Sequence, residues 1–337
     1  MVRRLMSLRY GHSNMARIAI TDGMAPNAVK HLEDSGHDVV LGFIAKEDLL
    51  TGALEGYDAV IIRSATKMSA EIIAANPSLK VIGRAGVGVD NIDLQAAKES
   101  GVMVVNAPRA STQSVIELTI GHLLASLRHI TSSNRGLRAG LWEKKQMTGT
   151  ELSGKCLGLI GYGRIAQGVA AVAKVMGMEI HTYDPYLPKR IAKQQGARLH
   201  EKVETLFENC THISIHCNLS DETYHLVNAE MMAKMPNKSR DGIVCGNHIV
   251  NCARGGIIDE DDLLAALQSG VVSSAALDVF EVEPVPKDHA LIQHENFHGT
   301  PHIGAATLEA QARVGIDIAD AVMVALSGKE PETIVKA

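Results

Sequence analysis

Three segments in the second half of the chain carry polar side chains of the kinds that transfer protons and bind carboxylates. The segment NCARGGIIDEDDLLAAL places Arg254 after a strand-like run. The segment ALDVFEVEP places Asp278 within such a run and Glu283 just beyond it, and TPHIGAAT places His302 after the run FHG. Because open parallel α/β sheets bind ligands beyond the carboxyl ends of their strands, these residues are candidates for one site.

These residue types suit a reaction that moves a hydride together with a proton. A histidine titrates near neutrality, so it can take or return the proton of a hydroxyl group. A neighbouring carboxylate would orient the ring, and an arginine fork matches a substrate carboxylate in two hydrogen bonds. A structural alternative stands beside each role, because the chain has 15 histidines and most arginines that follow strands are surface or packing residues.

A glycine-rich loop lies upstream, in the run GLIGYGRIAQG at residues 158–168. Gly161, Gly163 and Ala166 fit the pattern G-x-G-x-x-G/A, the phosphate-binding turn of a dinucleotide-binding βαβ unit. The first glycine permits the tight turn, the second lets the backbone approach a pyrophosphate, and the third position keeps helix and strand close. The phosphates would lie at the amino end of the following helix, where N–H groups and the helix dipole favour negative charge.

An acidic residue follows this loop at the spacing expected for a ribose ligand. Asp184 ends the run MEIHTYD, 23 residues after Gly161, close to the usual interval of about 20 residues. A carboxylate there would repel a 2′-phosphate, so the sequence predicts NAD rather than NADP. The alternative is an ordinary turn residue in DPYLP. A second glycine-rich run, GRAGVGVD at residues 83–90, lacks the spacing, and we interpret it as a loop whose N–H groups face the active site.

The elements that must position these residues alternate regularly along the chain. Such alternation predicts an α/β fold, with two doubly wound parallel-sheet domains of the Rossmann or flavodoxin-like kind and an active-site cleft between them. A long helical pattern over residues 111–137 separates the two series, and a final one over 308–328 returns to the first domain. We expect strands in the runs RIAIT, DVVLG, DAVIIR, KVIGRAG and VMVVNAP, and then in KCLGLIGYG, MEIHTYD, HISIHC, HIVNCARGG, AALDVF and FHGTPHIG.

The predicted domain limits follow from this alternation. Residues 1–14 form an N-terminal extension that we expect to be disordered. Residues 15–110 together with 305–337 form the substrate-binding domain, and residues 111–304 form the NAD-binding domain.

Composition excludes several classes of protein. A net charge of −5 and 21% charged residues give no electrostatic case for a nucleic-acid or anionic-membrane partner. No apolar run approaches the roughly 18–20 residues of a membrane span. The five cysteines are an odd number without a CxxC pair, so we expect reduced, buried thiols, no disulfide frame and no metal site.

The first 17 residues contain four arginines and no acidic residue. A short mitochondrial presequence and a plain N-terminal extension both fit this composition. We favour the extension, with Met15 near the start of the fold, and a cytoplasmic location.

The combination of motifs resembles the D-isomer-specific 2-hydroxyacid dehydrogenases, and within them the phosphoglycerate dehydrogenase branch. The similarity runs from about Arg17 to Asp320. It is carried by the segments IIRSATKMSAEII, VIGRAGVGVDNIDLQAA, LWEKKQMTGTELSGKCLGLIGYGRIAQGVA, VNCARGGIIDEDDLLAAL, ALDVFEVEP and TPHIGAATLEAQARVG.

The resemblance implies a role for individual residues. Arg254 would bind the substrate carboxylate, His302 would be the acid/base, and Glu283 would be the partner of the histidine. Substrate contacts would also come from Arg63, at the phosphate end, and from Ser64, Gly86 and Val87. The implied cofactor contacts are Val87, Gly161, Gly163, Arg164, Ile165, Asp184, Cys217, Cys252, Ala253, Arg254, Asp278, His302, Gly304 and Ala305.

The function implied in this way is the NAD-dependent oxidation of 3-phospho-D-glycerate to 3-phosphohydroxypyruvate, the first step of serine biosynthesis, by a homodimer. The nearest alternatives are a glyoxylate/hydroxypyruvate reductase or a D-lactate dehydrogenase, and a non-catalytic NAD-sensing protein of the same fold. Two features depart from the family pattern: HCNLSDET lacks the usual proline, and the loop 234–248 is longer than usual. The sequence ends at Ala337, so we expect a short form without the C-terminal regulatory domain.

Overall fold

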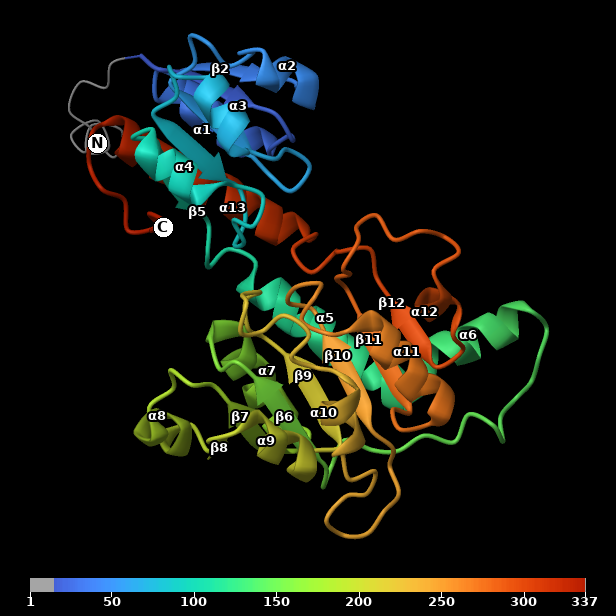
Figure 1. Cartoon of the computed structure of the whole chain (residues 1–337). Helices are drawn as coiled ribbons and strands as arrows, with labels where there is room; N and C mark the ends of the chain where they lie inside the picture. The colour runs from blue at the N-terminus through green and yellow to red at the C-terminus, as the bar shows by residue number, and fades with distance from the viewer. Residues whose placement is uncertain (1–14, 337) are drawn as a thin grey trace, which may run out of the picture. The chain divides into compact units, whose positions relative to one another are not determined.

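The computed structural model describes residues 15–336, which divide into two compact units. One unit combines the residues up to Ser111 with those from Ala305 onward, and the other runs from Thr112 to Gly304 (Figure 1). The predicted N-terminal extension, residues 1–14, lies outside the described residues.

The first unit is built on a five-stranded parallel sheet of order β2-β1-β3-β4-β5. Each strand is four residues long, and the strands on both sides of β1 and β3 are hydrogen-bonded in the same direction. Its strands are β1 (Arg17–Ile20), β2 (Asp38–Leu41), β3 (Ala59–Ile62), β4 (Val81–Arg84) and β5 (Met103–Asn106), and its helices are α1 (Pro26–Asp34), α2 (Lys46–Leu50), α3 (Ala70–Ala75), α4 (Leu94–Glu99) and α13 (Leu308–Leu326).

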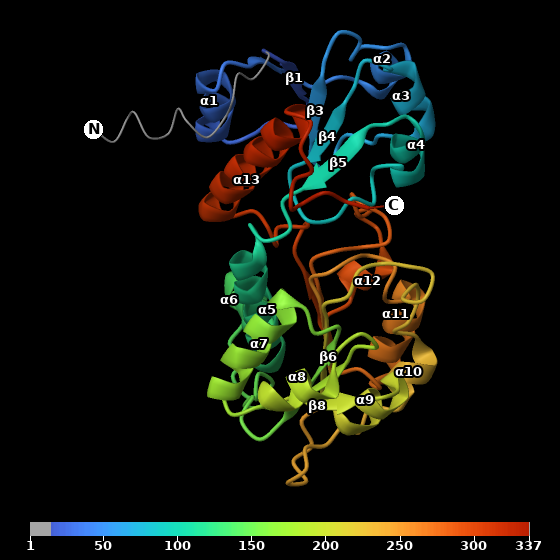
Figure 2. The same ribbon diagram turned by 90° about the vertical axis from the view of Figure 1, so that its left-hand side faces the viewer.

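The last helix, α13, lies against α1 and the strands β4 and β5 of this unit (Figure 2). Two glycines allow the close approach. A Cβ atom on Gly315 would lie 2.7 Å from the Cβ of Ala28 in α1, and one on Gly83 would lie 2.7 Å from Val322 Cγ2. A helix that follows the second sheet in sequence therefore packs against the first sheet.

The second unit is a seven-stranded parallel sheet of order β12-β11-β10-β9-β6-β7-β8. Its strands are β6 (Cys156–Ile160), β7 (Glu179–Tyr183), β8 (Arg198–His200), β9 (His212–Ile215), β10 (His248–Asn251), β11 (Ser274–Leu277) and β12 (Phe297–Gly299). Its helices are α5 (Thr112–Leu127), α6 (Ile130–Arg138), α7 (Arg164–Val175), α8 (Lys189–Gln194), α9 (Val203–Asn209), α10 (Ala229–Ala233), α11 (Glu260–Ser269) and α12 (Ala290–Gln293).

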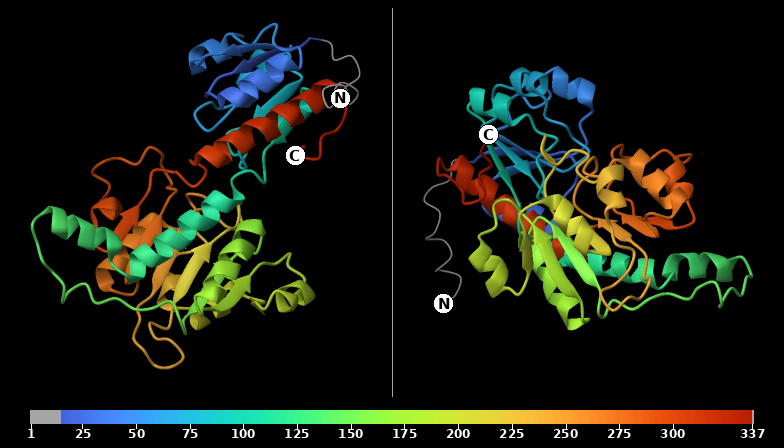
Figure 3. Two further views of the ribbon diagram at one scale, coloured as in Figure 1. Left: turned by 180° about the vertical axis from the view of Figure 1, so that it is seen from behind. Right: turned by 60° about the horizontal axis from the view of Figure 1, so that its bottom comes forward.

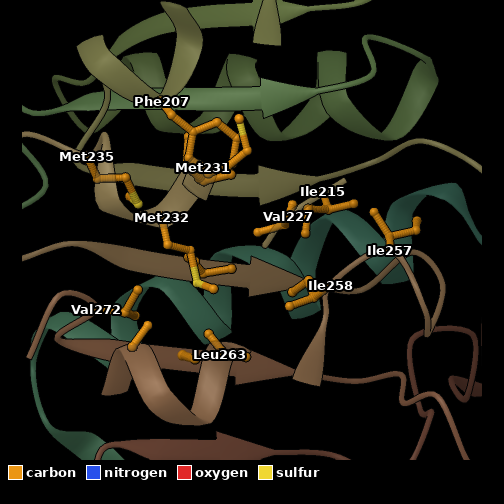
Figure 4. Packing of buried hydrophobic residues seen from close by; sticks show 14 of the residues in the cluster. Phe207, Ile215, Val227, Met231, Met232, Met235, Ile257, Ile258, Leu263 and Val272 are labelled. Carbon is orange, nitrogen blue, oxygen red and sulfur yellow. The ribbon is translucent and has the colours of Figure 1, made fainter. Parts of the chain in front are cut away.

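Helices cover both faces of this sheet, as a parallel sheet requires. On one face α5 and α7 pack together over β6 (Figure 3), and a Cβ on Gly168 would meet Ile116 Cδ1 at 2.1 Å. On the other face Phe207 of α9, Met231 of α10 and Leu263 of α11 fill the core (Figure 4). Aliphatic and methionine side chains supply most of this packing because aromatic residues make up 3% of the chain.

The long helix predicted over residues 111–137 is two helices, α5 and α6. His129 adopts a left-handed backbone conformation, with φ of 51°, between them. The carbonyl of Leu127 accepts a hydrogen bond from the backbone N–H of Thr150, and a Cβ on Gly149 would lie 2.0 Å from that carbonyl oxygen. The segment around Gly149 thus occupies the space into which a straight helix would continue.

The predicted fold class is confirmed, because both sheets are parallel throughout. None of the described helices is long and apolar enough to cross a membrane. The loop 234–248 extends beyond the sheet (Figure 1), and its two arms are joined by an antiparallel bridge between Lys238 and Val244.

The second unit contains buried histidines that make its stability depend on pH. Burial lowers the pKa of His122, His248 and His298 to about 4. In the unfolded chain they gain protons below about pH 6.5, so between these values the unfolded state binds more protons. We predict that the free energy of unfolding of this unit falls as the pH falls from 6.5 toward 4. Urea unfolding at about pH 7 and about pH 5, both above the ordinary carboxylate range, measures this loss.

The variant His248→Asn supplies the control. It removes one of the groups that take up a proton on unfolding, so the loss of stability between the two pH values should be smaller. An unfolding free energy that is the same at both pH values would contradict the prediction.

Candidate functional site

The glycine loop joins β6 to α7 in the conformation that a dinucleotide requires. Gly161 has φ of 83°, and a Cβ on it would lie 3.0 Å from the backbone of His216 and Cys217. Gly163 is the N-cap of α7, no side chain caps this helix end, and a Cβ on Gly163 would meet nothing within 4 Å. The amino end of α7 therefore offers open backbone N–H groups to an anion, flanked by Arg164 and Ile165.

Asp184 lies directly after β7, beside the glycine loop. Its Oδ2 accepts a hydrogen bond from the backbone N–H of Tyr162 at 2.9 Å, and its Oδ1 accepts one from Tyr186 at 2.9 Å. Each carboxylate oxygen can accept a second hydrogen bond, so the ribose-binding role and the structural role in the turn are compatible. The residues of this loop fit the adenosine and pyrophosphate parts of NAD.

The remaining candidate residues of this sheet follow the strands on the other side of β6. The chain continues from β6 to β7 on one side and from β9 to β12 on the other, so the position between β6 and β9 is the topological switch point where such sheets bind ligands. Cys217 follows β9, and Cys252 and Ala253 follow β10. Burial raises the pKa of Cys217 to about 11 and that of Cys252 to about 12. Both are neutral thiols at neutral pH, so this part of the site carries no thiolate charge.

Arg254 is held at the carboxyl end of β10 by its own loop. The side chain of Asn251 donates to the carbonyl of Arg254 at 2.8 Å and accepts from the N–H of Ala253 at 2.9 Å. A Cβ on Gly255 would lie 1.8 Å from the carbonyl oxygen of Phe280. Only glycine fits there. Because glycine has no side chain, the Arg254 loop packs directly against the turn that carries Glu283.

Asp278 anchors the loop that carries the histidine. It lies directly after β11 rather than within that strand, and its side chain is buried. Its Oδ1 accepts from the hydroxyl of Thr300 at 2.6 Å and from the N–H of Ile303 at 2.8 Å, and its Oδ2 accepts from the N–H of Gly304 at 2.8 Å. Three hydrogen bonds to one charged group thus fix the segment 300–304, whereas a cofactor contact of Asp278 stays a prediction.

His302 and Glu283 form a direct pair. Nδ1 of His302 lies 2.7 Å from Oε2 of Glu283, and Oε1 of Glu283 accepts from the N–H of Phe280 at 3.0 Å. Burial opposes the ionisation of Glu283, but the bond with His302, the bond from Phe280 and the charge of Arg254 together hold its pKa below the ordinary value. The carboxylate is therefore charged at neutral pH and fixes Nδ1, which leaves Nε2 of the histidine for a substrate.

The backbone of His302 is strained. Its φ is 52°, in the left-handed region that residues other than glycine rarely adopt. The N–H of His302 donates to the backbone carbonyl of Asp278 at 2.9 Å, which holds this conformation. Strain of this kind persists only where the surrounding structure enforces it, and it gathers at functional sites.

The predicted substrate residues of the first unit lie on two loops that follow adjacent strands. Arg63 and Ser64 follow β3, and Gly86 and Val87 follow β4. The N–H groups of Arg63 and Thr66 both donate to Oδ2 of Asp22, at 2.7 and 3.0 Å. The side chain of Asn91 donates to the carbonyls of the same two residues, and that of Asn106 donates to the carbonyl of Val87.

The candidate site residues of the second unit lie close together. Those of the first unit lie on loops at the edge of their own sheet. Arg254, Asp278, Glu283, His302 and Gly304 lie within one group of loops. Arg63, Ser64, Gly86, Val87 and Ala305 belong to the other unit. Sequence reasoning missed the positioning residues Asn251, Thr300, Asp22 and Asn91. The only sequence signal for them was a polar side chain within or just beyond a strand-like run.

The comparison with known proteins shows the family of the chain. Residues 120–304 match the family described as D-isomer specific 2-hydroxyacid dehydrogenase, NAD binding domain. Two relatives are each 44% identical to the chain. One is D-3-phosphoglycerate dehydrogenase of Methanocaldococcus jannaschii, where the match covers 95% of this chain and 59% of the relative. The other is hydroxypyruvate reductase of Thermotoga maritima, with 91% of this chain and 97% of the relative covered.

A solved structure of NAD+-bound 3-phosphoglycerate dehydrogenase from Entamoeba histolytica is also similar. It is 29% identical, with a TM-score of 0.78, and the match covers 96% of this chain and 99% of that one. The chain thus spans about three fifths of the length of its archaeal relative and nearly the whole of the other two. The matched region carries the glycine loop, Asp184, Arg254, Glu283 and His302, and the chain belongs to the D-isomer specific 2-hydroxyacid dehydrogenase family.

Proposed function

We propose that the chain is an NAD-dependent dehydrogenase that oxidises 3-phospho-D-glycerate to 3-phosphohydroxypyruvate, the first step of serine biosynthesis. The observation that carries the proposal is the His302–Glu283 pair at 2.7 Å, beside Arg254, in a unit that matches an NAD-binding domain. A non-catalytic NAD-sensing protein would not need this pair. The loop that carries His302 is strained and is held by three hydrogen bonds, which argues for a catalytic role.

The residues divide the chemistry between them. NAD, held by the glycine loop and Asp184, would supply the acceptor for the hydride on the carbon that bears the substrate hydroxyl. Nε2 of His302 removes the hydroxyl proton, and Glu283 stabilises the charged ring that results. Arg254 holds the substrate carboxylate in its guanidinium fork and aligns the 2-hydroxy group with the histidine. Glu283 does not itself take the proton, because Arg254 and its two hydrogen bonds favour the ionised carboxylate.

The choice of a phosphorylated substrate depends on cationic side chains other than Arg254. Arg63 follows β3 on a loop that Asp22 and Asn91 fix, which supports a role at the phosphate end of the substrate. A second candidate is a hydroxypyruvate or glyoxylate reductase, favoured by the relative in Thermotoga maritima that the chain covers almost completely. Absorbance at 340 nm with a panel of phosphorylated and unphosphorylated 2-hydroxy and 2-oxo acids separates the two. A higher kcat/KM for glyoxylate or hydroxypyruvate than for the phosphorylated acids would reject our choice of substrate.

The cysteine pattern bears on the compartment. All five cysteines are unpaired thiols and four of them are buried, which supports the cytoplasmic location that we propose.

The histidine should be the group whose removal costs most turnover. We predict that His302→Ala lowers kcat about 100- to 10,000-fold, the usual range for general acid–base catalysis, and leaves NAD affinity nearly unchanged. Steady-state kinetics and NAD fluorescence titration measure the two quantities.

Arg254 supplies the contrast. Arg254→Ala should raise KM strongly and also slow turnover, whereas Arg254→Lys should recover only part of the loss because an ammonium group cannot form the bidentate fork.

Near-normal turnover by His302→Ala would refute the mechanism.

A further prediction concerns the cofactor. Asp184→Ser removes the charge that repels a 2′-phosphate, so we predict weaker NAD binding and a smaller preference for NAD over NADP. Because Asp184 also accepts hydrogen bonds from Tyr162 and Tyr186, Asp184→Asn is the matched variant that keeps one acceptor oxygen. It should relax the cofactor preference with a smaller loss of stability. Unaltered affinity for both cofactors in Asp184→Ser would exclude this residue as the ribose ligand.

We also propose a homodimer formed through the segment from α6 to Thr150. No residue of α6 is buried, and the segment exposes Ile130, Leu137 and Trp142, with 82% of Trp142 accessible. Apolar side chains gathered on one exposed segment are typical of an interface. A second copy of the chain is the partner that the family resemblance implies for this segment.

The dimer prediction is tested by placing a charge in the patch. Trp142→Asp should halve the mass measured by light scattering at micromolar concentration, because an aspartate at an apolar interface loses its hydration. Val175→Asp is the control, since Val175 is 89% exposed and lies at the end of α7. A monomeric parent chain, or a Trp142→Asp variant that remains dimeric, would contradict the proposal.

A further inference from the structure

A second cluster of reactive side chains lies at the opposite edge of the seven-stranded sheet from the glycine loop. Cys156 is the first residue of β6 and Glu179 is the first residue of β7, and the two are paired in register. His181 lies two residues after Glu179, on the same face of β7. Among the described residues, these three form one group whose possible ligand atoms lie within 4.8 Å of one another.

His181 also contacts residues on the side away from the cluster. Its Nδ1 lies 3.0 Å from Nε2 of His200, and Nδ1 of His200 lies 3.1 Å from the hydroxyl of Thr205. That hydroxyl lies 2.8 Å from the backbone carbonyl of Lys202. In the tautomer that carries its proton on Nδ1, His181 donates to His200 and offers Nε2 as a metal ligand.

Nε2 of His181 faces the other two side chains of the group. Nε2 of His181 lies 3.0 Å from Oε1 of Glu179, and the Sγ of Cys156 lies 3.9 Å from Oε2 of the same carboxylate. His181 is fully buried, and Cys156 is almost so. A proton on Nε2 of His181 or a metal cation between the side chains would each account for the contact with Glu179.

We propose that Cys156, Glu179 and His181 bind a zinc ion. Nitrogen, sulfur and carboxylate oxygen are the ligands that Zn²⁺ prefers. Ligand atoms within 4.8 Å of one another, with His181 and Cys156 each in contact with the Glu179 carboxylate, suit bonds of about 2.0 to 2.3 Å to one ion. The contact from His200 to the far nitrogen of His181 is the outer-shell partner that zinc-binding histidines usually have. The Glu179 side chain is 43% exposed, which gives the ion a path from solvent.

Arg240 also contacts the carboxylate of the cluster. Its Nη1 lies 2.5 Å from Oε2 of Glu179, and it belongs to the long loop 234–248. A thiolate and a carboxylate together carry two negative charges, which offset the ion. The loop is thus fastened to the same carboxylate that we assign to the metal, and binding should tighten both the sheet edge and this loop.

The proposed site is separate from the chemistry of the other edge. Cys156 begins β6, whereas the glycine loop follows its last residue, Ile160. Zinc binding should therefore raise the stability of the second unit, by stabilising the folded state alone, and leave hydride transfer unaffected.

Cobalt(II) is the probe, because a thiolate–cobalt bond gives a charge-transfer absorption in the near ultraviolet. The full chain, freed of metal by a chelator and dialysed, should bind one cobalt ion with this absorption, and zinc should displace it and raise the unfolding temperature. Cys156→Ser should abolish the band, and Glu179→Gln should weaken binding. His200→Ala should weaken affinity about 10- to 100-fold, because His181 loses the outer-shell partner that orients its ring.

Glu201→Gln is the matched control, since Glu201 is an exposed carboxylate after β8 that pairs with Lys189. It should bind cobalt like the parent chain. Each variant should bind NAD normally, which shows that it is folded. If Cys156→Ser does not fold, Glu179→Gln takes its place in the test. A parent chain without the band, or a band that persists in Cys156→Ser, overturns the proposal. In the first case a proton joins His181 to Glu179, and in the second the ion binds elsewhere.

Discussion

The parallel direction of the strands is the constraint on which the rest of the second unit depends. Because all seven strands point the same way, every segment that follows a strand emerges at one edge of the sheet. The glycine loop, Asp184, Cys217, Arg254, Asp278 and His302 come from six different strand ends, yet they share that edge. The same constraint gathers the first residues of the strands at the opposite edge, where Cys156 meets Glu179 in register. One sheet therefore offers two chemically different edges.

Sharing an edge is not enough to make a site, and local contacts supply the remaining precision. The buried carboxylate of Asp278 accepts three hydrogen bonds from segment 300–304. These bonds offset the cost of the left-handed backbone at His302, which is of order 1 kcal/mol or more. Gly255 brings the Arg254 loop within contact of the turn that carries Glu283. A catalytic pair and its substrate arginine are thus positioned by residues that need not touch the substrate.

Buried histidines connect the interior of this unit to its environment. With aromatic residues at 3% of the chain, imidazole rings occupy positions that phenyl rings often fill, as in the stacked pair of His212 and His248. Burial keeps His248 and His122 neutral, so each acts as a hydrogen-bond partner rather than a charge. At the amino edge His181 is likewise buried, between His200 on one side and Glu179 on the other. The proposed metal site rests on the proximity of His181, Cys156 and Glu179, and not on the number of histidines.

The sequence by itself determined the features that local patterns encode. The glycine spacing, Asp184, and the order of Arg254, Glu283 and His302 predicted the fold class, the cofactor and the candidate catalytic group, because each lies at the end of a recognisable strand. Tertiary contacts decided the rest. The break between α5 and α6 arises from a segment around Gly149 that lies more than 20 residues downstream of Leu127. Cys156, Glu179 and His181 form no short-range motif such as CxxC, because strand pairing brings together residues that lie 23 positions apart, as Cys156 and Glu179 do. Register between strands depends on the packing of whole sheets, and no short stretch of sequence contains it.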